Sequence, residues 1–260
     1  MSGLRRAAGA AAGPVSGDQA PAPDFMPFPR GGRVFRSSRL VRRADAAPSG
    51  RLRLDALARY LQDVAEDDVA DTGWQAPYEW LLRRCTVVIS GYPNRGERVG
   101  LATFCSATGP RWAERTTTVS GNDGALMQAI AVWVAVDPDS GRPAELGPGF
   151  LQWYGAAASG REVSARLSLP GPPQSLTGRP WPLRASDFDA ADHVGNTIHW
   201  AAAEDVISGL PWLPARAVVE YSSEILAGHE PRLATEIDHD RAVMWLLDGN
   251  RKLAAAALFR

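Results

Sequence analysis

Three carboxylates and a histidine lie close together between Asp187 and Asn196, just ahead of a predicted helix. Asp189 precedes His193 by four residues, so its carboxylate can orient the imidazole and raise its basicity. The first turn of the following helix offers backbone N–H groups without intrahelical partners, and these can stabilise an oxyanion. The spacing therefore predicts acid–base chemistry at a turn. Asp and Asn also cap helices, so a purely structural role stays open.

Other common chemistries find no support in the sequence. The two cysteines, Cys85 and Cys105, lie in apolar runs typical of strands, where buried thiols are expected. His199, His229 and His239 have no partner at the spacing of a metal site. The chain has neither a Gly-x-Ser-x-Gly elbow nor a glycine-rich phosphate loop. We therefore expect no metal and no cofactor.

The composition is that of a chain with one large hydrophobic core or two fused ones: 260 residues, 45% of them hydrophobic. The formal net charge of −1 argues against nucleic acid as a partner. No apolar run reaches the roughly 20 residues that span a bilayer, so we expect a cytoplasmic protein without a membrane span. Residues 1–32 are rich in Ala, Gly and Pro, which predicts a disordered tail, with a transit extension as the alternative.

A strand–turn–helix pattern occurs twice along the chain. Residues 40–45 lead into a predicted helix over 54–71, and residues 183–187 lead into another over 197–208. The first helix has apolar residues at three- and four-residue spacing, and Gly73 stands where a C-terminal cap belongs. The repeat predicts a duplicated α+β unit.

Four strands are expected after each helix. Asn-Asp-Gly at 122–124 and Asp-Gly-Asn at 248–250, each between apolar runs, are strong hairpin signals. The predicted strands cover 80–90, 98–107, 115–120 and 127–137 in the first half, and 215–226, 232–239, 242–247 and 252–259 in the second.

Several motifs resemble those of acyl-ACP thioesterases, in the same order along the chain. Residues 187–196 resemble the family signature Asp-x-Asp-x-Asn-x-His-Val-Asn-Asn, and residues 219–224 resemble the strand that supplies its catalytic glutamate. The matching segments of the first half are Leu-Gln-Asp-Val-Ala at 61–65, Trp-Leu-Leu-Arg at 80–83, Tyr-Pro-Asn-Arg-Gly-Glu at 92–97 and Ala-Val-Trp-Val-Ala-Val-Asp at 131–137. The resemblance covers about residues 33–260.

The resemblance implies an α+β tandem double hotdog, in which two long helices are each wrapped by an antiparallel β-sheet. Residues 33–150 would form an N-terminal hotdog with the acyl pocket, 151–179 a linker, and 180–260 a catalytic hotdog. One chain then already mimics the dimer of small hotdog proteins, so we expect a monomer or a homodimer.

The resemblance also implies hydrolysis of a fatty acyl thioester, carried by acyl carrier protein or CoA, through attack by water. Glu224 would be the general base in a site that excludes water, and His193 would protonate the leaving thiolate; His193 as the base is the alternative. Asp189 would fix the tautomer of His193. Backbone N–H groups around Gly195 and Asn196 would polarise the carbonyl, although Gly195 could instead serve a turn with positive φ.

The acyl pocket is expected around four large apolar side chains of the first half. They can equally be plain core residues, so chain length does not follow from the sequence. They are Leu57, Leu61, Trp74 and Trp80.

The chain departs from the family signature at three positions. Ala191 and Gly195 stand where the signature has asparagines, and Ile225 stands where a cysteine often follows the glutamate. The missing cysteine fits a water mechanism. The missing amide at Ala191 leaves open a catalytically degenerate acyl-binding or accessory protein. A hotdog enoyl hydratase is a third hypothesis, with weaker support from the motif spacing.

Overall fold

The computed structural model describes residues 26–174, 176–249 and 251–260. Most of the predicted N-terminal tail, residues 1–25, lies outside the described residues. Its last residues contact the sheet: the Met26 backbone N–H donates to Gln128 Oε1 at 2.6 Å, and the Phe28 ring lies 6.0 Å from that of Phe104.

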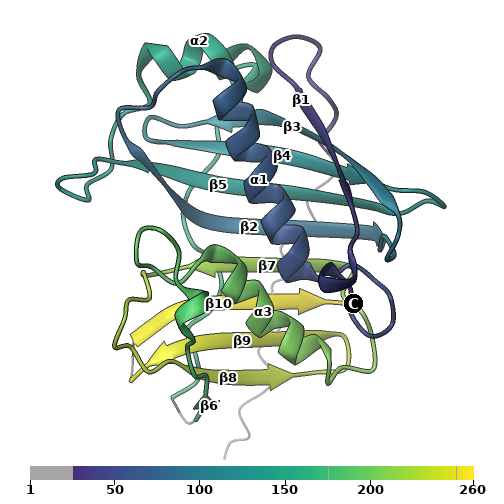
Figure 1. Cartoon of the computed structure of the whole chain (residues 1–260). Helices are drawn as coiled ribbons and strands as arrows, with labels where there is room; N and C mark the ends of the chain where they lie inside the picture. The colour runs from purple at the N-terminus through teal and green to yellow at the C-terminus, as the bar shows by residue number, and fades with distance from the viewer. Residues whose placement is uncertain (1–25, 175, 250) are drawn as a thin grey trace, which may run out of the picture.

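The first half begins with strand β1 and helix α1 (Figure 1). Helix α1 buries Leu54, Leu57 and Val64 on one stripe and ends at Gly73, whose φ of 67° is left-handed. Four strands follow, of which β3, β4 and β5 form a meander and β2 pairs with β5. The bounds are β1 Phe35–Leu40, α1 Leu54–Thr72, β2 Glu79–Gly91, β3 Arg98–Thr108, β4 Trp112–Ser120 and β5 Leu126–Val136.

The second half repeats this order after an additional helix. Each half carries a short 3-10 turn between its first strand and its sheet-covering helix, at Arg43–Asp45 and at Ala185–Asp187. The bounds are α2 Gly147–Ala158, β6 Arg179–Pro180, α3 Asn196–Ile207, β7 Arg216–Tyr221, β8 Arg232–Ile237, β9 Arg241–Asp248 and β10 Arg251–Phe259.

The ten strands of the described residues belong to one antiparallel sheet. Its order is β1-β3-β4-β5-β2-β7-β10-β9-β8-β6, so each half has the same internal order and the two halves meet where β2 pairs with β7. Figure 1 shows α1 lying across the sheet of the first half and α3 across the sheet of the second half. The predicted tandem double hotdog is therefore confirmed, with its two sheets joined edge to edge into one.

Helix α2 differs from the expected organisation. It crosses the boundary expected at residue 150, and its Phe150 and Tyr154 pack with Cys105 of β3 in a small second core. The helix covers the end of the first sheet beyond α1 (Figure 1). What was expected as linker is thus partly a structural element of the first hotdog.

The rest of the connection is tied to the sheet by a buried carboxylate. Glu220 of β7 is fully buried and accepts the backbone N–H groups of Ser168 and Leu169 at 2.7 and 2.9 Å. These charge-assisted bonds hold a segment without helix or strand against the sheet.

The two halves are also joined through their helices. Arg51 Nη1 and Nη2 donate to the two carboxylate oxygens of Glu204 on α3 at 2.9 and 2.7 Å. Glu204 Oε1 also accepts the Leu54 N–H at 2.6 Å and so satisfies one open donor at the start of α1. Both charged side chains are about nine-tenths buried, which makes this a specific joint between the hotdogs.

Candidate active site

A tight turn presents His193 just before α3. The Asp189 N–H donates to His193 O at 2.8 Å, and Asp192 takes the left-handed φ of 60° that lets the chain reverse. The Asp189 carboxylate lies inside this turn, where Oδ1 accepts the N–H groups of Ala191 and His193 at 2.9 and 3.2 Å. Asp189 therefore shapes the turn through main-chain bonds.

This differs from the role expected for Asp189. In the described structure, its side-chain hydrogen bonds go to main-chain N–H groups and none goes to the His193 imidazole. The residue contributes to the position of the histidine backbone, and the expectation that it fixes the tautomer of His193 is not met in this structure.

The segment after β7 brings Glu224 to this turn. Strand β7 ends at Tyr221, five residues earlier than expected, because the N–H groups of Ser222 and Ser223 both donate to Leu253 O, at 2.9 and 3.0 Å. The chain then bends and pairs with the His193 turn, where the Val194 N–H donates to Ile225 O at 2.9 Å.

His193 and Glu224 face each other as a result. His193 Nε2 lies 3.9 Å from Glu224 Oε2, too far for a direct hydrogen bond and close enough for one water to join the two groups. Their side chains are 38% and 49% exposed, so water reaches both. The water exclusion expected around Glu224 is therefore not found in the structure.

The start of α3 has one backbone donor fewer than expected. The Gly195 N–H already donates to Asp187 O at 2.9 Å, so it is not available to a carbonyl in this conformation. Gly195 has a φ of −59°, so the positive φ considered for it is wrong. Asn196 is the first residue of α3, and its N–H has no partner within the helix.

A cavity of about 520 Å³ begins beside this turn, where Asp189 and Asn196 line it. Along α1 its wall is a single stripe of residues, spaced three and four apart. Beyond the end of α1 the wall continues with Trp74, Trp80 and Phe150 of α2. The α1 stripe consists of Gln62, Ala65, Glu66, Val69, Ala70 and Gly73.

The predicted acyl-pocket residues separate into three groups. Trp74 and Trp80 line this cavity. Leu61 lines a small neighbouring cavity of about 30 Å³ that shares Asn196 with the large one. Leu57 is 1% exposed and lies in the main core, and it belongs to the lining of neither cavity.

The proposed catalytic residues are brought together at the mouth, but not all into the cavity. Among the described residues, Asp189 and Asn196 are in the lining, whereas His193 and Glu224 are not. His193 therefore lies next to the cavity on the same turn as Asp189, and Glu224 faces it from the segment after β7, where water reaches both.

The sequence did not predict that polar side chains and a residue of α2 would line the cavity. Arg115 of β4 lines both cavities, and Phe150 of α2 lines the large one. Pro148 near the first turn of α2, followed by Phe150 and Tyr154 at helical spacing, was the available signal for this helix.

The buried titratable groups near the site do not supply a nucleophile. Burial raises the pKa of the Cys85 thiol to about 12 and that of Cys105, which lines the cavity, to about 11, so neither forms a thiolate at neutral pH. Burial lowers the pKa of His199 to about 4, and its neutral ring packs 4.8 Å from the Tyr221 ring under the start of α3.

Two further features are absent from the described part of the chain. No group of three or more His, Cys, Asp or Glu side chains there could hold a metal ion. None of its helices combines the length and the hydropathy that crossing a membrane requires.

Comparisons with known proteins agree with this geometry. Residues 32–154 match the family model of the acyl-ACP thioesterase N-terminal domain. Two uncharacterized proteins of Mycobacterium tuberculosis, from strains H37Rv and CDC 1551, are each 28% identical over 235 residues, which cover 89% of this chain and 94% of theirs.

Solved structures share the whole fold. A 12:0-ACP thioesterase from Umbellularia californica superposes with a TM-score of 0.74 at 18% identity, covering 89% of this chain and 98% of the other. An acyl-ACP thioesterase from Bacteroides thetaiotaomicron gives 0.69 at 16% identity, covering 87% and 97%. The N-terminal half of the chain thus matches the acyl-ACP thioesterase family model, and the described chain as a whole shares the double-hotdog fold of these thioesterases.

Proposed function

We propose that this protein hydrolyses fatty acyl thioesters of acyl carrier protein, with water as the nucleophile and His193 and Glu224 as the acid–base pair. The observation that carries the proposal is the 3.9 Å approach of His193 Nε2 to Glu224 Oε2 beside an elongated cavity. The family match supports the thioester as the bond that is broken.

The gap between the two groups suits a bound water. Glu224 accepts a proton from the water as it attacks the thioester carbonyl, and His193 gives a proton to the leaving thiolate. The N–H of Asn196 at the start of α3 stabilises the developing oxyanion. The reversed assignment, with His193 as the base and Glu224 as the acid, uses the same atoms.

The acyl chain occupies the cavity along α1. The wall includes the apolar side chains of Ala65, Val69 and Phe150, and burying an alkyl chain against such groups is favourable by about 0.8 kcal/mol per methylene. The acyl-binding role therefore belongs to the first hotdog and the chemistry to the second.

The proposal also names the group that carries the acyl chain. Acyl carrier protein is favoured over CoA because the matched family model and the two similar structures carry acyl-ACP or 12:0-ACP in their names. We place the reaction in the cytoplasm, where one chain as a monomer, or a homodimer, releases free fatty acid.

The departures from the signature do not remove the proposed pair. Ala191 lies at the exposed tip of the turn and takes part through its N–H, which bonds to Asp189. Ile225 is buried and holds the turn through its carbonyl. Neither position supplies a reacting group in the water mechanism.

A thioester panel tests the proposal. The purified full-length chain is incubated with acyl-ACP and acyl-CoA of matched chain lengths, and free thiol and free acid are measured together. We expect equal amounts of thiol and acid, with faster release from acyl-ACP. Tight binding of every substrate without release of thiol would instead support the acyl-binding alternative.

A further inference from the structure

One cationic side chain lies in the wall of the proposed acyl cavity, which is also lined by carboxylates such as Glu114. Arg115 of β4 lines both the 520 Å³ cavity and the small cavity beside it, although only 13% of its side chain is exposed. A guanidinium in the wall of a site for a plain alkyl chain needs an explanation, because covering it with methylene groups removes water from its donors without replacing the hydrogen bonds.

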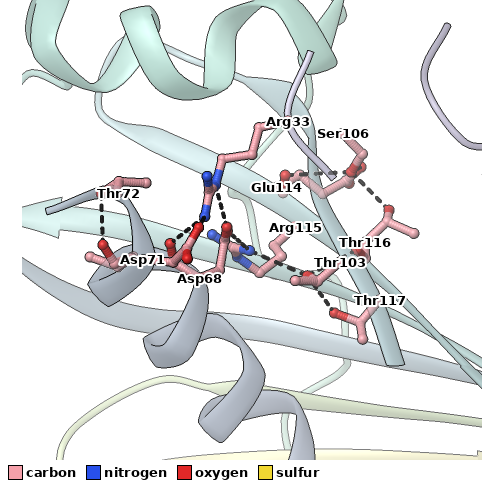
Figure 2. Close-up of polar contacts among 11 residues, drawn as sticks. Arg33, Asp68, Asp71, Thr72, Thr103, Ser106, Glu114, Arg115, Thr116 and Thr117 are labelled. Atoms are coloured by element: carbon pink, nitrogen blue, oxygen red, sulfur yellow. Dashed lines mark hydrogen bonds and ion pairs between the residues drawn. The ribbon is translucent and has the colours of Figure 1, made fainter. Parts of the chain in front are cut away.

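Arg115 is fixed by a compact ion-pair cluster, shown in Figure 2. Its Nη1 donates to Asp68 Oδ2 at 2.6 Å, and Asp68 is fully buried. Asp68 Oδ1 accepts from Arg33 Nε at 2.5 Å, and Arg33 Nη2 donates to Asp71 Oδ2 at 2.7 Å. Two arginines face two aspartates, so the cluster is charge-balanced without a ligand.

The cluster leaves hydrogen-bond donors of Arg115 unused. Besides Asp68, Nη1 reaches Thr103 Oγ1 at 3.3 Å, and the guanidinium lies over the Tyr154 ring, 5.5 Å from its centroid. These three contacts occupy at most three of the five N–H donors of a guanidinium. Because Arg115 lines the cavity, a molecule bound in the cavity can accept hydrogen bonds from the remaining donors.

The position of Arg115 along the cavity is set by α1. With a rise of 1.5 Å per residue, the lining stripe from Gln62 to Gly73 is roughly 17 Å long. Asp68, which holds Arg115, lies roughly 9 Å from the level of Gln62, near the middle of the stripe. Gln62 and Asn196 line both cavities, and Asn196 follows the turn that carries His193. Arg115 therefore meets the middle of an acyl chain that enters the large cavity from this end.

We propose that Arg115 is a specificity-determining residue, which makes this cavity select acyl chains with a neutral oxygen, hydroxyl or keto, near mid-chain. The inference rests on the proposed function and names its substrate class. A neutral acceptor is favoured over a carboxylate because Asp68 and Asp71 already balance the charge of Arg115 and Arg33. Such an oxygen satisfies the open donors that a plain chain would cover.

Binding of the product acids tests the inference without requiring catalysis. Trp74, Trp80 and Trp133 line the cavity, so their fluorescence reports occupancy. The probes are dodecanoic acid, dodecanoic acid with a mid-chain hydroxyl, and a dicarboxylic acid of the same length. Because a hydrogen bond to a charged group is worth about 1.5–3 kcal/mol, we expect the hydroxylated acid to bind wild type about 10- to 100-fold more tightly than the plain acid.

Two variants assign the preference to Arg115. Arg115→Met should bind both monoacids equally. Arg33→Met is the matched control, since it removes the other partner of Asp68 but leaves Arg115 in the cavity wall, and it should keep the preference. If Arg115→Met does not fold, the double variant Asp68→Leu with Arg115→Met removes the buried carboxylate as well and should show the same loss of preference.

The outcomes separate this inference from the proposed hydrolysis. Equal binding of the plain and hydroxylated acids by wild type, or tightest binding of the dicarboxylic acid, overturns the inference. The same substituents are then compared in acyl-ACP hydrolysis. A preserved binding preference with no release of thiol would overturn the proposed function alone, and hydrolysis without any preference would overturn the inference alone.

Discussion

At the scale of single residues, the structure reassigns Asp189. The sequence places a carboxylate four residues before a histidine, which is the spacing of an orienting group as well as of a turn-forming one. In the structure, Asp189 Oδ1 accepts two main-chain N–H groups and thereby sets the turn that carries His193. The residue was identified from sequence, but its role was not, because spacing does not show which atoms of the histidine the carboxylate reaches.

Substitution of Asp189 distinguishes the two roles. Asp189→Asn keeps a side-chain oxygen that can accept both N–H groups, so kcat should stay within a few-fold of wild type. Asp189→Ala loses both bonds, about 1–3 kcal/mol in total, so kcat should fall roughly ten- to hundredfold if the turn loosens. Steady-state kinetics on one acyl-ACP substrate measure this. Equal losses in both variants would return Asp189 to a role that depends on its charge.

At the scale of elements, the repeated order of strands and helices could be predicted from the sequence, but the contacts that connect the elements could not. Apolar periodicity and two hairpin turns predicted α1, α3 and most strands to within a few residues, because these signals are local. Helix α2 and the early end of β7 were missed. The end of β7 depends on Ser222 and Ser223 sharing the carbonyl of Leu253, a contact between distant parts of the chain that no local pattern contains.

The joint between α1 and α3 should contribute strongly to stability. Glu204→Ala leaves the buried Arg51 guanidinium and the Leu54 N–H without their acceptor, so the free energy of unfolding should fall by about 3–5 kcal/mol. Urea denaturation of the purified variants measures it. Asp205→Asn is the control, because its ion pair with Arg179 is exposed and should contribute less than about 1 kcal/mol. Similar losses in the two variants would contradict a special role for the joint.

At the scale of the whole molecule, one buried histidine should make folding stability depend on pH. Burial lowers the pKa of His199 from 6.5 to about 4, so between these values the unfolded chain binds a proton that the folded protein does not. Stability is therefore full above pH 6.5 and falls by roughly 3 kcal/mol as the pH drops to 4. Urea unfolding across this range should show a flatter profile for His199→Phe. The exposed His239 serves as control through His239→Gln, and an unchanged slope in His199→Phe would contradict the assignment.

At the same scale, the cavity and the proposed catalytic pair belong mainly to different halves of the molecule. The first hotdog, with α2 added, encloses the cavity, and the second supplies the turn, Glu224 and the start of α3. The duplication could be predicted because both halves repeat the same order of elements. The charged residue in the cavity wall could not be predicted. The sequence around Arg115 indicates only a strand, and its ion pair with Asp68 depends on how α1 packs on the sheet.

The most direct test of the proposed mechanism is a substitution of Glu224 that keeps the shape of the side chain but removes its acid–base function. Glu224→Gln is compared with wild type and with Glu230→Gln, an exposed carboxylate on the same loop, by thiol release from acyl-ACP at saturating substrate. We expect kcat to fall roughly 10²- to 10⁴-fold in Glu224→Gln and to stay at the wild-type value in Glu230→Gln. Unchanged turnover in Glu224→Gln together with a large loss in Cys105→Ala would contradict the proposed mechanism.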